Sequence, residues 1–339
     1  MPMGKVLRVV IRRSINAVVT IFGIICLNYV LIRLMPGDPN LALVPRNTQF
    51  IGLAKANAEL FGLDKPPFEQ FVIYLQNTVT LNWGYSYFWR APVADLLFHD
   101  LGWTLLLVGT STIFTILIGM IVGSYAAVKR GRPFDLASTG LSIFFYGMPI
   151  FWLGIVLQVA FSRSSFLKGY FSWWPVLPSG GYLDDPPFPQ QWAWDWAHIA
   201  SVSTHLILPA LTLSVGTLAG ISLVMRSSLI DVMTEDFVTT AKAKGLSDRQ
   251  VLRRHIFPNG LPPMVSLIAL DIAFILGGAY QVEWVFNYRG IGWRTIEAIH
   301  NLDYPLLQFI IVVGGVAIVL ANLVSDFLLL YLDPRIKVA

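Results

Sequence analysis

Charged residues are scarce in this sequence. Only 13% of its 339 residues are Asp, Glu, Lys or Arg, whereas 55% are apolar, and the mean hydropathy is +0.63. Soluble domains carry charges on about a quarter of their residues, because polar side chains have to cover their surface. The composition therefore excludes an ordinary water-soluble protein and indicates that lipid surrounds most of the chain.

Residues that carry covalent or metal chemistry are also few. Cys26 is the only cysteine, so no disulfide can form within the chain. The motifs H-E-x-x-H, C-x-x-C and G-x-S-x-G are absent, as is the phosphate-binding loop G-x-x-x-x-G-K-[ST]. The five histidines are scattered along the chain. We therefore expect no catalytic residue, no metal site and no nucleotide bound by this chain.

Two further patterns are missing. No run of Lys and Arg alternates with aromatic residues, so nucleic acid is not an expected partner. No internal repeat is visible, which removes the usual sequence evidence for a secondary transporter built from inverted repeats.

Long apolar stretches predict six membrane-spanning helices, because about 20 apolar residues are needed to cross the hydrocarbon core. The first stretch follows four basic residues, as in a signal peptide, but it is too long for an h-region and no small-residue cleavage site follows, so we expect it to be retained. Pro149 and Pro209 lie in the third and fourth predicted spans, where neighbouring helices can satisfy the freed carbonyls. The predicted spans of this all-α polytopic protein are Ser14–Leu34, Leu101–Val128, Leu136–Phe161, Leu206–Met225, Leu261–Val282 and Leu306–Leu332.

The distribution of basic residues predicts the orientation. Six spans place both termini on one side of the membrane. The segments on that side are short, namely the N-terminus, 129–132, 226–254 and the C-terminal tail, yet they hold 15 of the 24 Lys and Arg residues. Because cytoplasmic loops are enriched in Lys and Arg, both termini are predicted to lie in the cytoplasm, with the chain in the plasma or inner membrane.

Aromatic residues gather in the predicted outer segments, at Trp83–Trp89 and between Trp173 and Trp196. One interpretation is an interfacial belt, in which the rings lie among the lipid headgroups. The other is a stacking platform for a sugar or an aromatic substrate near the external mouth.

A carboxylate at Asp271 lies within the fifth predicted span. Such a group costs a few kcal/mol to insert and is expected to face protein or water. It is a candidate for the translocation path, where it would meet a substrate amine, or else a structural partner for a polar group on a neighbouring helix. Glu283 and His205 lie nearer the outer ends of spans, where we expect their side chains to reach the interface.

The cytoplasmic segment between the fourth and fifth spans predicts two short helices. Asp236 lies at the start of the first helix and Lys242 and Lys244 at its end, as the helix dipole favours. Gly245 follows in the position where glycine ends helices. Ser247-Asp-Arg-Gln250 is a capping box that begins a second helix.

The second helix is expected to stop before Pro258, because proline disrupts a helix interior. The small residues Thr240, Ala241 and Ala243 lie just before the glycine turn, where they would let another backbone approach closely. The segment therefore predicts either a docking site for another protein, with lysines at its rim, or an amphipathic loop lying on the lipid headgroups.

These residues resemble a known motif. Ala241-Lys-Ala-Lys-Gly245, followed by Pro258-Asn259, is similar to the coupling motif of the permease subunits of binding-protein-dependent ABC importers. Thr239-Thr240-Ala241 replaces the Glu-Ala-Ala that opens the family motif, so no acidic role is assigned to position 239. Further motifs, in the same order, resemble the first-subunit permeases of dipeptide and oligopeptide importers. They are Arg33–Pro39, Gly62–Pro66, Trp83–Ser86, Pro149–Gly154, Leu177–Gly180, Gly277–Gly278, Glu283, Phe286, Gly290–Gly292, Asp303–Pro305 and Asp333–Arg335.

The resemblance implies a type I ABC importer transmembrane domain that works with several partners. These are a second homologous permease, two cytoplasmic ATPases that bind ATP and magnesium, and an extracellular or periplasmic substrate-binding protein. It further implies an N-terminal end with the first span (1–35), an outer loop region (36–100) and a permease core (101–339) with a coupling loop at 226–260. The implied coupling residues are Asp236, Thr239, Thr240, Ala241, Lys242, Ala243, Lys244 and Gly245.

The substrate implied by the resemblance is a di- or oligopeptide, while oligosaccharides and nickel complexes remain alternatives on the same scaffold. Two interpretations from other classes also remain. One is a self-sufficient channel or secondary transporter with Asp271 in its pore, and the other is a membrane-anchored assembly protein.

Overall fold

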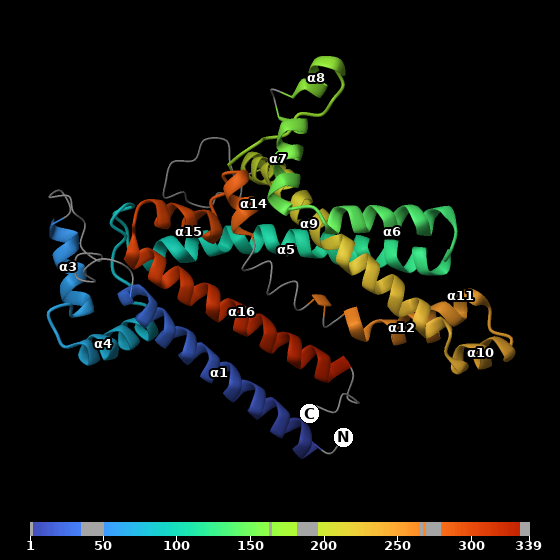
Figure 1. The fold of residues 1–339 in the computed structure, drawn as a ribbon, viewed down its shortest axis with the longest axis horizontal. Coiled ribbons are helices and arrows are strands. Elements are labelled where there is room, and N and C mark those ends of the chain that lie inside the picture. The colour runs from blue at the N-terminus through green and yellow to red at the C-terminus, as the bar shows by residue number, and fades with distance from the viewer. Residues whose placement is uncertain are drawn as a thin grey trace.

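The computed structural model describes residues 3–34, 51–162, 165–181, 196–264, 267–268 and 279–332, and these residues form helices and no β-strand (Figure 1). Lipid offers no hydrogen-bond partners to the backbone, and a helix satisfies its own N–H and C=O groups internally. The helices are α1 (Met3–Leu34), α3 (Ile51–Phe61), α4 (Pro67–Thr80), α5 (Val93–Val128), α6 (Pro133–Tyr146), α7 (Ile150–Phe161), α8 (Phe166–Tyr170), α9 (Trp196–Met233), α10 (Asp236–Ala243), α11 (Asp248–Val251), a π-helical turn (Leu252–Ile256), α12 (Phe257–Gly260), α14 (Tyr280–Val285), α15 (Ile291–His300) and α16 (Tyr304–Leu332).

Four of the predicted spans are confirmed as long apolar helices. Within the described ranges, α1, α5, α9 and α16 are long and apolar enough to cross a membrane. In Figure 1 the right-hand ends of these helices are the start of α1 and the ends of α5, α9 and α16. The fifth predicted span, Leu261–Val282, lies mostly outside the described residues.

The third predicted span is broken. α6 and α7 meet at an angle of 104°, with Gly147, Met148 and Pro149 between them. Proline has no N–H to donate and disfavours helical backbone in the residue before it. The third predicted span is therefore formed by two helices with a sharp bend before Pro149. Pro209, in contrast, is accommodated inside α9, where it is buried.

The central contact of the molecule is between α5 and α9, and small residues let the two helices approach closely. A Cβ added at Gly123 would lie 2.5 Å from the Ser222 carbonyl oxygen and 2.8 Å from Met225 Cβ, and one at Gly119 would lie 2.8 Å from Ile221. These two glycines form a G-x-x-x-G pair, the spacing that lets membrane helices pack backbone to backbone.

Hydroxyl groups add interhelical hydrogen bonds to this contact. Ser214 Oγ donates to the Ser111 carbonyl at 3.2 Å, and Thr115 Oγ1 donates to the Ser214 carbonyl at 3.3 Å. Each such bond in a membrane contributes about 0.6 kcal/mol on average. Close packing and hydrogen bonding therefore act at the same helix pair.

A second pair, α1 and α16, lies side by side in antiparallel orientation (Figure 1). Arg13 and Asp326 form an ion pair between the start of α1 and the end of α16. Nearer the other end, the buried Asn28 Nδ2 donates to the Gln308 carbonyl at 2.9 Å. α3 and α4 pack beside this end, where Trp83 stacks on Phe309 with ring centroids 5.1 Å apart.

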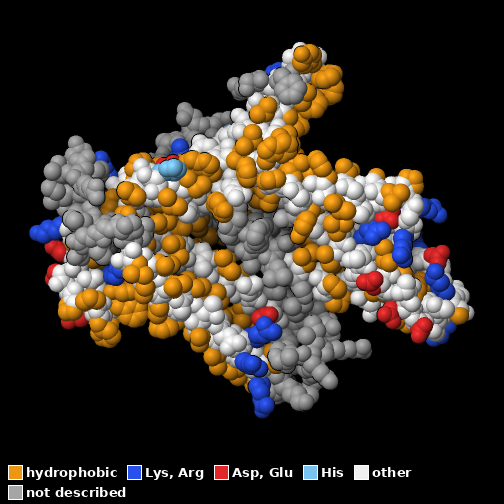
Figure 2. Space-filling view, in the orientation of Figure 1, with side chains coloured by type: hydrophobic (Ala, Val, Ile, Leu, Met, Phe, Trp, Pro, Cys, Tyr) orange, Lys and Arg blue, Asp and Glu red, His pale blue; other side chains and the backbone are white. Residues whose placement is uncertain are grey.

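Apolar side chains cover much of the surface, as Figure 2 shows over the long helices. Charged side chains gather instead over α10 and α11 and near the start of α1 (Figure 2). This division is what a protein surrounded by lipid requires, with the charged ends in water.

We predict that Gly123→Ala destabilises the protein by about 1–3 kcal/mol, because the added methyl forces α5 away from α9. The measurement is thermal unfolding of the purified chain in detergent. Gly109→Ala is the matched control, since a Cβ there meets nothing within 4 Å. It should be neutral or stabilising by up to about 1 kcal/mol. Equal melting temperatures for the two variants would contradict the close contact.

Candidate functional site

The helices α10 and α11 follow the end of α9 in the chain and together form an exposed block. α10 has one face turned into the protein, where Val238 and Ala241 are 3% and 4% exposed. Its other face is open, and the predicted coupling residues Asp236, Thr239, Thr240, Lys242, Ala243, Lys244 and Gly245 are all exposed. Ala241 is thus separated from the other predicted residues, because it packs against the chain's own core.

The turn between the two helices follows the sequence prediction. Gly245 has φ of +81°, a left-handed conformation that glycine adopts without a steric penalty. Its N–H donates to the Lys242 carbonyl at 2.9 Å. Ser247 and Gln250 form the predicted capping box, with reciprocal backbone and side-chain hydrogen bonds.

The second helix does not stop before Pro258, so that prediction is wrong. After α11 the helix widens into the π-helical turn Leu252–Ile256, in which the Phe257 N–H donates to the Leu252 carbonyl, and it continues as α12 through Pro258. A regular α-helix would bring the proline ring against the carbonyl four residues earlier. The wider turn provides room for that ring.

A buried apolar cluster fixes the block to the two central helices. Met225 and Leu229 of α9 and Val251 of α11 are fully buried in it, and Ala127 from the end of α5 joins them. Ser228 Oγ donates to the Gly260 carbonyl at 2.9 Å, and a Cβ at Gly260 would meet Leu229 at 2.5 Å. The block and the end of α9 are therefore closely packed.

The open face of the block carries charges of both signs (Figure 2). Lys242 Nζ lies 3.6 Å from Asp248 Oδ1 and links α10 to α11, but both side chains are largely exposed. Exposed pairs of this kind contribute little to stability. The lysines Lys242 and Lys244 therefore remain available to an acidic surface.

An ion pair ties α6 to α9 above this block. Arg226 donates from Nε and Nη2 to the carboxylate of Asp135, and the Gly131 N–H donates to the same carboxylate at 2.8 Å. A bidentate Arg–carboxylate contact has a defined geometry as well as strength. The loop between α5 and α6 is thereby held to α9.

A second polar cluster lies at the opposite ends of the long helices. Arg294 of α15 donates to both carboxylate oxygens of Asp100 of α5, at 2.5 and 3.1 Å, and its guanidinium lies 4.3 Å from the centre of the Trp89 ring. Both charged side chains are 0–1% exposed. Removing one partner from such a buried pair is strongly destabilising, because the other charge stays uncompensated.

Glu283 belongs to the same end of the molecule and is fully buried. Thr104 Oγ1 donates to it at 2.8 Å and the Trp293 N–H at 3.0 Å. The expectation that this side chain reaches the interface is wrong, because α5 and α15 enclose it. His205 is buried too, with Nδ1 2.9 Å from the Ser201 carbonyl oxygen.

Two of the quoted motifs meet in this region. Ser86 Oγ donates to the carboxylate of Asp303, and the Phe88 N–H donates to it at 3.2 Å. Burial raises the pKa of Asp303 above its usual value, and the hydrogen bonds from Ser86 and from the backbone offset part of that rise. Sequence spacing gave no signal for this contact, which joins residues 217 positions apart.

The aromatic residues divide between core and surface. Trp83 is 4% exposed and belongs to the core, so it serves neither as a belt residue nor as a stacking platform. Trp173 and Trp196 are 72% and 82% exposed and remain available for either role. Asp271 lies outside the described residues. Within the described part of the chain, no group of three or more His, Cys, Asp or Glu side chains could hold a metal ion.

The family described as "Binding-protein-dependent transport system inner membrane component" matches residues 115–338. The chain belongs to this family. The family described as "Binding-prot-dependent transport system membrane comp, N-term" matches residues 6–108. The chain is accordingly a multi-pass membrane component of an ABC transport system, and the resemblance seen in the sequence is confirmed.

Two relatives of this family member align with it over almost its full length. It is 33% identical to the dipeptide transport system permease protein DppB of Escherichia coli (strain K12), over 98% of this chain and 99% of that protein. It is 32% identical to the glutathione transport system permease protein GsiC of the same strain, with the same coverage. A solved structure of the MetNI methionine ABC transporter in an inward-facing conformation is similar in fold, with a TM-score of 0.54 and 17% identity over 71% of this chain and 98% of that chain.

The two faces of α10 should respond differently to the same substitution. We predict that Ala241→Trp lowers the free energy of unfolding of this permease by at least about 2 kcal/mol, because the ring does not fit the buried cluster. Ala243→Trp, two residues away on the open face, should stay within about 0.5 kcal/mol of the wild type. Thermal unfolding in detergent measures both, and a stable Ala241→Trp variant would contradict the buried position.

Proposed function

We propose that this chain is one of two permease subunits of an ATP-driven, binding-protein-dependent importer, most directly for di- or oligopeptides. In this proposal it forms half of the translocation path, and cytoplasmic ATPases hydrolyse ATP and bind magnesium. Family membership and near full-length similarity to DppB and GsiC support it.

The observation that carries the proposal is the α10–Gly245–α11 block. It presents an open face outside the long helices, while its inner face is packed on the ends of α9 and α5. A protein bound to that face would therefore act on both central helices at once. Asp236, Thr239, Thr240, Lys242, Ala243, Lys244 and Gly245 form the proposed contact, and Ala241 holds the helix in place.

The proposed topology has six spans with both termini in the cytoplasm. The right-hand helix ends in Figure 1 include the start of α1 and the end of α16, and the exposed block also lies on the right. The region at the opposite ends, with α3, α4 and the segment before α5, belongs to the proposed outer loop region 36–100. A substrate-binding protein would approach from that side, while Asp271 in the fifth span stays a candidate for the path.

The proposed substrate class rests on the named relatives, whose printed substrates are a dipeptide and glutathione. Exposed Trp173 and Trp196 keep an oligosaccharide as the second candidate, because sugars stack on aromatic rings. Nickel complexes remain a third.

A bulky substitution on the open face should detach the ATPases. We predict that the tagged wild-type chain co-purifies with a second permease and ATPase activity, and that Ala243→Trp lowers the co-purifying ATPase activity at least tenfold by blocking close approach. Ala200→Trp, an exposed alanine near the other end of α9, is the matched control and should leave it unchanged.

The same complex in proteoliposomes separates the function classes. Uptake of a labelled dipeptide should require ATP and the binding protein, and unlabelled dipeptide should compete better than maltotriose. ATP-independent flux through the chain alone would instead indicate a channel or secondary transporter, and a complex without any flux an assembly protein.

The topology has its own test. In a Cys26→Ser background, Tyr170→Cys in α8 should react with a membrane-impermeant maleimide on intact cells, because Tyr170 is 82% exposed on the proposed outer side. Thr240→Cys should react only after permeabilisation. Labelling of Thr240→Cys from outside would overturn the proposed orientation.

A further inference from the structure

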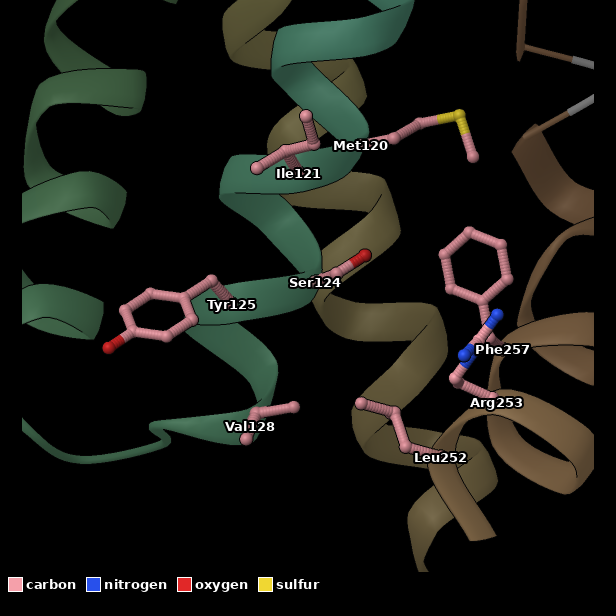
Figure 3. A pocket seen from close by; sticks show the side chains of 8 residues that line it. All are labelled: Met120, Ile121, Ser124, Tyr125, Val128, Leu252, Arg253 and Phe257. Atoms are coloured by element: carbon pink, nitrogen blue, oxygen red, sulfur yellow. The ribbon is translucent and has the colours of Figure 1, made fainter. Parts of the chain in front are cut away.

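A groove of about 690 Å³ lies between the last turns of α5 and the π-helical turn with α12 (Figure 3). Its volume falls within the range of about 300–1,000 Å³ that is typical of small-molecule sites. Apolar side chains form most of its walls. The lining residues are Met120, Ile121, Ser124, Tyr125, Val128, Leu252, Arg253 and Phe257.

Two polar groups enter this apolar groove from opposite walls. Figure 3 shows the Ser124 hydroxyl pointing from α5 toward the wall that carries Phe257 and Arg253. The Ser124 oxygen is buried and has no hydrogen-bond partner among the described residues. Arg253 is the charged lining residue, and no described carboxylate forms an ion pair with it.

The surroundings of the groove are basic. α5 ends at its rim, and Lys129 follows directly, with Nζ 5.8 Å from the centre of the Tyr125 ring. Among nearby carboxylates, Asp135 is held by Arg226 and Asp248 lies beside Lys242. The groove thus offers cationic donors to an anion, together with an apolar wall.

The apolar wall continues an exposed apolar surface of α5. Ile121, Tyr125 and Val128 are exposed on α5, as are Leu117 and Ile118 one turn earlier. A ligand with an anionic head and a hydrocarbon chain matches both parts of this groove, whereas a soluble anion would leave the apolar wall in water.

We propose that the groove binds an acidic phospholipid of the cytoplasmic leaflet. The phosphate lies at Arg253, within reach of Lys129, and one acyl chain runs along Met120, Ile121 and Phe257. Basic pockets beside cytoplasmic helix ends are known to take such headgroups. The inference rests on the proposed cytoplasmic orientation of this end.

Arg253 lies in the π-helical turn, and this turn also connects the block formed by α10 and α11 to α12. A lipid in the groove contacts α5 and this turn together, so acidic lipid is expected to stabilise the junction through which the block is attached.

The test uses the intact transporter complex with 1-palmitoyl-2-oleoyl-phosphatidylglycerol as the probe, and native mass spectrometry counts the lipids that stay bound. Arg253→Gln should reduce retained phosphatidylglycerol at least fivefold and leave phosphatidylcholine unchanged. Arg254→Gln, the exposed neighbour that does not line the groove, is the matched control and should retain the wild-type amount. Co-purification of the ATPases confirms that each variant is folded.

Three outcomes would overturn the proposal. Equal loss in both variants would show diffuse surface charge, and no loss in Arg253→Gln would show that the groove is not the site. In a Cys26→Ser background, a cross-link from Ile121→Cys to the second permease would show that protein fills the groove. Failure of the proposed function is distinguished by the absence of co-purifying ATPase activity from the wild-type chain, and failure of the proposed orientation by the maleimide labelling at Thr240→Cys; neither depends on lipid binding.

Discussion

The contact between α5 and α9 is the constraint on which the rest of the molecule depends. Gly119 and Gly123 allow the two backbones to touch, and hydroxyl groups on both helices complete the contact with hydrogen bonds. In lipid there is no hydrophobic force to drive two apolar helices together, so close packing and polar contacts have to do so. The other elements attach to this pair, at one end through the apolar cluster under α10 and at the other through Asp100 and Glu283.

The two ends of the pair differ in chemistry. At the end with α14 and α15, buried ion pairs and hydrogen bonds enclose carboxylates completely. At the end with α10 and α11, the core is apolar and the charges lie on an open face. A buried polar network specifies one arrangement of its partners, whereas an open face with charges of both signs is suited to a surface that binds and moves.

Much of the fold and of the site was predictable, because the signals are local. Apolar length located four single-helix spans, and turn chemistry located Gly245 and the capping box at Ser247. The effect of each proline on its helix was not predictable, since α9 continues through Pro209 whereas the helix ends before Pro149 and the chain bends there. Nor was the burial of Glu283, whose partner Thr104 lies 179 residues away. The inward face of α10 is likewise determined by contacts with residues distant in the sequence, in α5 and α9, which the residue pattern of α10 itself does not reveal.

The burial of Val238 and Ala241 has a mechanical consequence. Because α10 packs against the end of α9 through these buried side chains, a force on its open face is transmitted to α9. α9 has 38 residues and is about 57 Å long at 1.5 Å per residue. At that length a tilt of about 5° about one end displaces the other by about 5 Å, close to the rise of one helical turn. The length of α9 thus turns a small rotation at the end that carries α10 into a displacement of about one helical turn at its other end.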